Sequence, residues 1–326
     1  MTDPEISESG PTFAASFEDV QAAAERIRPH VHNTPVLTSA AIDSLAGATV
    51  HLKSEHLQRA GSFKARGAHN KLLSLDDAER ERRVVTVSSG NHAGALACAG
   101  ARLGVEVDVF MPEDAPELKA RAAESYGATI HRFNRFTDDR QELEDEFVAR
   151  TGAVPAPPFD DPQVIAAQGT VALEFHDQAE LDTLVVPVSG GGLMAGCAIA
   201  SRHLAPGCRI VGVEPAGAAD TVMSFEAGHP VAVDRPDTIA DGLAVHAPGN
   251  LTFPIMFEFV DEIVTVADSA ITEAMVVLFE RTKQVVEPSG AAALAAVLDG
   301  LVTGQRIGVV LSGGNIDVPR LCHLTG

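Results

Sequence analysis

Short runs of β-branched and other apolar residues alternate with longer, alanine-rich stretches along most of the chain. The apolar runs are continuous, as in strands that are covered on both faces of a sheet. The longer stretches have the pattern of helices. We therefore predict strands at 48–54, 83–88, 105–111, 183–188, 209–214, 262–266 and 306–311, and helices at roughly 17–29, 64–75, 91–103, 115–126, 137–150, 161–177, 191–203, 271–284 and 288–300.

This alternation predicts an α/β protein with parallel sheets covered by helices on both faces. The proline-rich segment 153–162 breaks the rhythm and should be an extended crossover. We therefore expect a smaller domain at 84–159, inserted into a larger one made of 16–83 and 160–326. The polar, turn-rich residues 1–15 are expected to form a flexible tail.

Composition narrows the class of protein. The 326 residues are 45% apolar, which is ample for a core, and the net charge of −21 argues against a nucleic-acid partner. No apolar run is long enough to span a membrane, and the first residues lack the features of a signal peptide. We expect a soluble cytoplasmic protein. The chain has four cysteines, Cys98, Cys197, Cys208 and Cys322, and none of them form a CxxC motif. Their spacing therefore predicts neither a zinc site nor a disulfide framework.

Lys64 stands out in the stretch RAGSFKARGA, because the chain has only five lysines beside nineteen arginines. An arginine would serve a salt bridge or a phosphate clamp better, whereas a lysine suits an amine that must lose its proton and act as a nucleophile. A position at the start of a helix, with Arg66 nearby, lowers the pKa of such an amine. A solvated surface lysine is the alternative, and it fits poorly with the small residues Ala60 and Gly61.

A glycine triplet, Gly190, Gly191 and Gly192, follows the predicted strand 183–188 and opens a predicted helix. Such a turn lets the backbone wrap around a phosphate. The same stretch also satisfies G-x-G-x-x-A through Ala195, and Glu214 follows about 20 residues on. An NAD-binding site therefore stays open as an alternative.

Two further stretches of small polar residues end predicted strands. The turn SSGNH contains Ser88, Ser89 and Asn91 and suits the binding of a carboxylate. The same residue types also occur in an ordinary helix cap, which is the alternative. Ser312, in LSGGN, presents its hydroxyl to the crevice at the strand ends, unless the segment is a plain turn. Together with Lys64 and the glycine triplet, these stretches describe a pyridoxal phosphate (PLP) site that carries an amino acid.

Eight motifs then point to one family. They are SFKARGA (62–68), SSGNH (88–92), QGTVALE (168–174), SGGGL (189–193), VEP (213–215), TIADG (238–242), EPSGA (287–291) and LSGGN (311–315). In this order, from about residue 17 to 320, they resemble the serine/threonine dehydratase and serine racemase family of PLP enzymes. The resemblance implies the fold type II (tryptophan synthase β-like) architecture of two three-layer, parallel-sheet domains, and a homodimer or homotetramer.

The resemblance also implies roles for individual residues. Lys64 bonds covalently to the cofactor and moves the Cα proton, while Ser89 occupies the position that serves racemases as acid or base on the opposite face. The expected cofactor contacts are Phe63, Lys64, Asn91, Gly190, Gly191, Gly192, Leu193, Gly242 and Ser312. The expected substrate contacts are Ser88, Ser89, Asn91, His92 and Arg140.

A divalent cation is a further expectation. Glu214, Ala218 and Asp220 have the spacing of the family's cation site, two carboxylates and one backbone carbonyl. Ligands that are all oxygen suit Mg²⁺, Ca²⁺ or Mn²⁺. Two surface carboxylates in a loop are the alternative.

The neutral Ser312 bears on the type of reaction. A hydroxyl opposite the pyridine nitrogen would not keep that nitrogen protonated, which disfavours a long-lived carbanion and favours prompt loss of a β-hydroxyl. We therefore expect an L-threonine/L-serine ammonia-lyase that yields 2-oxobutyrate or pyruvate and ammonia. The alternatives are a serine racemase, a 3-hydroxyaspartate dehydratase, an NAD-dependent oxidoreductase or a catalytically inactive sensor.

Overall fold

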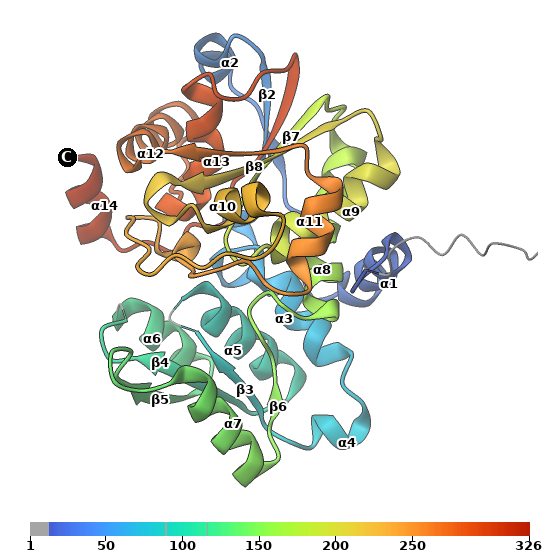
Figure 1. Ribbon diagram of the computed structural model, residues 1–326, viewed down its shortest axis with the longest axis vertical. Helices are drawn as coiled ribbons and strands as arrows, with labels where there is room; N and C mark the ends of the chain where they lie inside the picture. The colour runs from blue at the N-terminus through green and yellow to red at the C-terminus, as the bar shows by residue number, and fades with distance from the viewer. Residues whose placement is uncertain (1–12, 89, 116) are drawn as a thin grey trace, which may run out of the picture.

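The structure is a computed structural model that describes residues 13–88, 90–115 and 117–326. Its larger sheet has six strands in the order β1-β2-β10-β7-β8-β9 (Figure 1). All neighbours in this sheet are parallel except β1 and β2, which pair antiparallel. The strands are β1 (Val36–Leu37), β2 (Thr49–Lys53), β7 (Thr183–Pro187), β8 (Arg209–Pro215), β9 (Glu262–Val266) and β10 (Arg306–Val310).

A second sheet of four parallel strands lies below the larger one in Figure 1, in the order β5-β4-β3-β6. Its strands are β3 (Val84–Val87), β4 (Val107–Pro112), β5 (Thr129–Phe133) and β6 (Val154–Pro155). The predicted α/β class with parallel sheets is confirmed. The exact limits of the two domains stay a prediction.

Helices cover both sheets (Figure 1). They are α1 (Phe17–Ile27), α2 (Ala40–Ala46), α3 (Lys64–Leu73), α4 (Asp77–Arg80), α5 (Asn91–Leu103), α6 (Glu117–Ser125), α7 (Arg140–Thr151), α8 (Pro162–Gln178), α9 (Gly192–Leu204), α10 (Asp220–Ala227), α11 (Thr252–Phe259), α12 (Asp268–Thr282), α13 (Pro288–Leu298) and α14 (Val318–Thr325). Short 3₁₀ turns occur at η1 (Glu55–Leu57), η2 (Arg59–Gly61), η3 (Ala216–Ala218) and η4 (Asp241–Leu243).

Each strand and helix predicted from the sequence overlaps an observed element, but several short elements were missed. The strand β5 has the sequence TIHRF and is only partly buried, so it has no continuous apolar run. The strands β1 and β6 have two residues each, too few to show a period. The helices α2, α4, α10, α11 and α14 have eight residues or fewer, which is about two turns.

The core explains why the predicted strands are apolar throughout. Leu184 and Val186 of β7 belong to the hydrophobic cluster on one face of the larger sheet, and Val185 between them belongs to the cluster on the other face. The sheet is therefore buried on both sides, as parallel sheets usually are. Within the described ranges, no helix is long and apolar enough to cross a membrane. The four cysteines are unpaired, as predicted.

Candidate active site

Lys64 is the first residue of α3, and the preceding turn requires an unusual backbone. Gly61 has φ +73°, and a Cβ there would lie 2.2 Å from Oδ1 of Asn315, so only glycine fits. The Lys64 amine donates a hydrogen bond to the carbonyl of Pro158 at 2.6 Å and lies 5.1 Å from the centre of the Phe63 ring. Burial lowers the pKa of Lys64 to about 8. A fraction of this amine is therefore neutral, and thus nucleophilic, near neutral pH.

The glycine triplet forms a cradle at the end of β7. A Cβ at Gly190 would lie 2.4 Å from the Phe159 ring, and one at Gly191 would lie 2.6 Å from Cε of Met256. Glycine is therefore required on the packed side of the loop. The helix α9 begins at Gly192 without a side-chain cap, so the N–H groups of its first turn are free for an anion. This arrangement fits the phosphate of PLP.

The turn that follows β3 ends in a second uncapped helix start. The helix α5 begins at Asn91 after Gly90, again with no side-chain cap. The side chain of Asn91 is held from two sides, because it donates to Glu287 and accepts from Asn315 at 3.0 Å. Ser88 accepts a hydrogen bond from the N–H of Gly90 at 3.3 Å, while Ser89 lies outside the described residues.

His92 can serve a carboxylate only through its backbone. Its Nε2 lies 2.8 Å from the carbonyl of Ala156, which only accepts, so Nε2 carries the proton. The other nitrogen, Nδ1, is buried, has no partner within the part of the chain that the structure describes, and is left as an acceptor. Burial lowers the pKa of His92 to about 3, so the ring stays neutral. A neutral ring that presents a lone pair does not attract a carboxylate.

Ser312 and Gly242 both bind to one residue, Ser289. The Ser312 hydroxyl donates to the carbonyl of Ser289 at 3.3 Å, and the N–H of Gly242 donates to the Ser289 hydroxyl at 2.9 Å. A Cβ at Gly242 would lie 2.8 Å from that hydroxyl. Ser312 is buried and follows β10, and Phe63 donates its N–H to the Ser312 carbonyl at 3.1 Å. The loop after β10 is thereby joined to the turn that carries Lys64.

Comparison with known proteins identifies a family that has such a site. Residues 27–313 match the model of the pyridoxal-phosphate dependent enzyme family. The chain belongs to this family. It is 44% identical to the L-threo-3-hydroxyaspartate ammonia-lyase of Saccharomyces cerevisiae, covering 95% of this chain and 96% of that protein. It is 42% identical to the serine racemase of Schizosaccharomyces pombe, covering 94% and 96%.

Solved structures agree with this family assignment. Maize serine racemase superposes with a TM-score of 0.92 at 39% identity, covering 95% of this chain and 97% of that chain. The T.th. threonine deaminase superposes with a TM-score of 0.88 at 45% identity, covering 93% and 99%. The predicted family and its fold are therefore confirmed, and the NAD-binding alternative is disfavoured.

In this member of the PLP-dependent family, Glu214 and Asp220 form a buried acidic pair. Glu214 accepts hydrogen bonds from the N–H groups of Thr221 at 3.1 Å and Val222 at 3.0 Å, whereas both carboxylate oxygens of Asp220 are buried with no partner among the described residues. Burial raises the pKa of both carboxyls, and the nearby Asp220 adds to the effect at Glu214. The alternative of two surface carboxylates is therefore wrong, because both side chains are fully buried.

A divalent cation fits this pair. It would satisfy the unpartnered oxygens of Asp220 and remove the repulsion between two buried acids. Ala218 is buried in the turn η3, which lies between them along the chain, and its carbonyl role stays a prediction. In the part of the chain that the structure describes, no group of three or more His, Cys, Asp or Glu side chains could hold a metal ion, so any cation here would depend on backbone and water oxygens.

Two side chains at this site were not assigned from the sequence. Glu287 is buried, and burial raises its pKa to about 7. Lys119 of α6 forms an ion pair with Asp241, and its Nζ lies 3.5 Å from where a Cβ of Gly90 would be. The scarcity of lysine, which marked Lys64, marks Lys119 equally. Arg140, by contrast, is exposed at the start of α7, and its predicted contact with a substrate stays a prediction.

Proposed function

We propose that this protein is a PLP-dependent ammonia-lyase that removes water from a β-hydroxy amino acid, with L-threo-3-hydroxyaspartate as the preferred substrate. The observation that carries the proposal is the half-buried Lys64, whose amine has its pKa lowered to about 8, together with the uncapped helix start at the glycine triplet. The proposal includes the homodimer or homotetramer implied by the resemblance.

When bound, PLP would supply an electron sink that makes the Cα proton of an amino acid acidic. The N–H groups from Gly190 to Leu193 would hold its phosphate, and Ser312 would face its ring nitrogen. The Lys64 amine, in its neutral form, would take the Cα proton. The N–H groups of the turn 88–92 would hold the substrate's α-carboxylate.

The predicted partner of the ring nitrogen, Ser312, supports elimination over racemisation, because a neutral hydroxyl favours early departure of the β-hydroxyl. The relatives include both activities: five between 40% and 42% identical are serine racemases. Three between 40% and 44% identical are L-threo-3-hydroxyaspartate ammonia-lyases or a β-hydroxyaspartate dehydratase. They favour hydroxyaspartate over the threonine and serine expected from the sequence.

The second carboxylate of hydroxyaspartate needs a cation that serine and threonine do not need. Lys119 is placed for this role, since its ammonium lies against Gly90 in the turn that would hold the α-carboxylate. Its side chain is 9% exposed, so the charge is poorly screened by water.

The test is a product profile of the PLP-loaded protein with L-threo-3-hydroxyaspartate, L-serine and L-threonine. We expect oxaloacetate and ammonia to form with the highest kcat/KM, and Lys64→Ala to lower the rate by about 10³-fold or more. A chiral assay for D-serine separates the racemase alternative. The proposal is wrong if none of the three substrates gives a 2-oxo acid, or if D-serine forms faster than any 2-oxo acid.

A further inference from the structure

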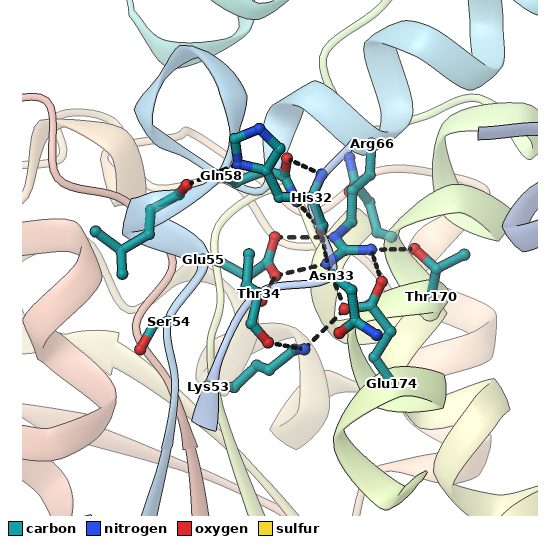
Figure 2. Close-up of polar contacts among 12 residues, drawn as sticks. His32, Asn33, Thr34, Lys53, Ser54, Glu55, Gln58, Arg66, Thr170 and Glu174 are labelled. Carbon is teal, nitrogen blue, oxygen red and sulfur yellow. Dashed lines mark hydrogen bonds and ion pairs between the residues drawn. The ribbon is translucent and has the colours of Figure 1, made fainter. Parts of the chain in front are cut away.

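Four charged side chains form a cluster behind the first turn of α3, which we call the buried ion cluster: Lys53, Glu55, Arg66 and Glu174 (Figure 2). The first three are fully buried, and the side chain of Glu174 is 19% exposed. Two cations face two anions, so the cluster is neutral as a set.

Arg66 lies at the centre of the cluster, and all of its N–H groups find acceptors. Its Nε and one terminal nitrogen bind the two oxygens of Glu55 at 2.9 and 2.7 Å. Its two terminal nitrogens bind the two oxygens of Glu174 at 2.7 and 2.8 Å, and further contacts reach Thr170 at 3.1 Å and the carbonyl of His32 at 3.4 Å. A planar guanidinium held by two carboxylates has its orientation fixed.

Lys53 closes the other side of the cluster. Its amine donates to Glu174 at 2.7 Å, to Gln178 at 2.8 Å and to the carbonyl of Thr34 at 2.9 Å. An ammonium has three donors, so none is left over. The cluster therefore ties together four segments: the end of β2 with η1, the start of α3, the helix α8 and residues 32–34, as Figure 2 shows.

Stability alone is a weak reason for such a cluster. The desolvation of buried charges offsets most of their attraction, and apolar side chains of similar volume often serve as well. What the paired charges add is a defined direction for each side chain. The relevant direction here is that of α3, because Arg66 is only two residues beyond Lys64.

The helix places Arg66 and Lys64 on opposite sides of one turn. Each residue turns an α-helix by about 100°, so two residues separate the side chains by about 200°. Arg66 therefore holds the rear of the turn whose front presents the Lys64 amine to the Pro158 carbonyl. The same cluster fixes Glu55, and its neighbour His56 donates its N–H to the carbonyl of Leu311 at 2.9 Å, next to Ser312.

We propose that Arg66 is a positioning residue, which through Glu55 and Glu174 fixes the first turn of α3 and keeps the Lys64 amine directed toward the Pro158 carbonyl. The proposal rests on the proposed function, in which Lys64 is the reactive amine. Arg66 itself would touch neither substrate nor cofactor.

The test compares Arg66→Lys, which keeps the charge but loses the planar fork, with Lys71→Met as a matched control. Lys71 is on the same helix and also pairs with α8, through Asp161 at 2.6 Å, but lies two turns from Lys64. The readout is the pH dependence of acylation of the Lys64 amine by acetic anhydride, measured by mass spectrometry on the full chain after removal of PLP.

We expect half-maximal acylation near pH 8 in the unaltered protein and in Lys71→Met. In Arg66→Lys the midpoint should rise by about one pH unit, so that labelling below pH 8 slows about tenfold. In the PLP-loaded protein, kcat should fall about tenfold or more with KM nearly unchanged, because substrate binding is not altered.

If Arg66→Lys lowers the melting temperature but leaves the acylation profile and kcat unchanged, the cluster has only a structural role and the proposal is overturned. Should Arg66→Lys fail to fold, Glu174→Gln provides the milder variant, since it keeps an acceptor and removes one charge, and an unchanged midpoint there overturns the proposal equally. Acylation needs neither cofactor nor substrate. Failure of the product assay with a normal acylation profile therefore counts against the proposed function instead.

Discussion

Lys53 and Lys64 are eleven residues apart, and Lys53 is fully buried whereas Lys64 is half-buried. Their hydrogen-bond partners differ as well. The amine of Lys53 has three acceptors, one of them a carboxylate, whereas the amine of Lys64 has a single neutral carbonyl. Burial lowers the pKa of both, but Glu174 opposes the effect at Lys53. A buried amine with all of its donors bound is structural, and one that lacks an anionic partner is available for chemistry.

Two buried glutamates show the same difference. Burial alone would raise the pKa of Glu55, but the Arg66 guanidinium lowers it overall. Among the residues that the structure describes, no cation lies beside Glu214, and burial together with Asp220 raises its pKa. Buried charges that are paired with an opposite charge therefore have a structural role. Buried charges without such a partner mark the places where a ligand is expected.

The largest effect should follow from breaking a balanced group. Lys53→Met would leave Glu174 without one of its two cations and would take one donor away from the carbonyl of the buried Thr34. We expect the free energy of unfolding to fall by about 3–5 kcal/mol, measured by urea denaturation. Lys283→Met, at an exposed position, is the control and should change it by about 0.5 kcal/mol or less. Equal urea midpoints for Lys53→Met and Lys283→Met would contradict the comparison.

A somewhat smaller effect should follow from supplying the charge that an unbalanced group lacks. Mg²⁺ or Mn²⁺ at the Glu214–Asp220 pair would stabilise the folded protein by about 2.7 kcal/mol at a hundredfold excess over its Kd. Asp220→Asn should abolish the rise in melting temperature, because one of the two carboxylates is gone. A rise of the same size in Asp220→Asn would place the cation elsewhere.

The sequence predicts the fold class and the reactive loops, but it does not predict the buried ion cluster. The α/β class followed from the continuous apolar runs, Lys64 followed from the scarcity of lysine, and the glycine triplet and Ser312 followed from small residues at strand ends. Lys53, Glu55 and Glu174 carry no such local signal, since 121 positions separate Lys53 from Glu174. Their pairing exists only because β2, α3 and α8 meet in the fold.

The orientation of the His92 ring could not be predicted from the sequence either. The motif SSGNH placed it correctly at the helix start, but only the Ala156 carbonyl shows which ring nitrogen carries the proton. Likewise, Glu287 and Lys119 reach the site from segments that are distant along the chain. Periodicity and spacing describe neighbours within an element, whereas these contacts join different elements.

The smallest effect should come from Lys64 itself, and it should have the opposite sign to that of Lys53. In the PLP-free protein, Lys64→Met removes a half-buried charge that has a neutral carbonyl but no anion as a partner among the described residues, so below pH 8 the variant should be more stable by about 2 kcal/mol. Between pH 8 and 10.5 the folded amine is neutral while the unfolded one still binds a proton, so the unaltered protein gains stability as pH rises and the difference closes. Urea denaturation at a series of pH values measures this, with Lys283→Met as a control that should show no such trend. If the unaltered protein is the more stable one below pH 8, then the Pro158 carbonyl satisfies the Lys64 ammonium, and the contrast between the two lysines is wrong.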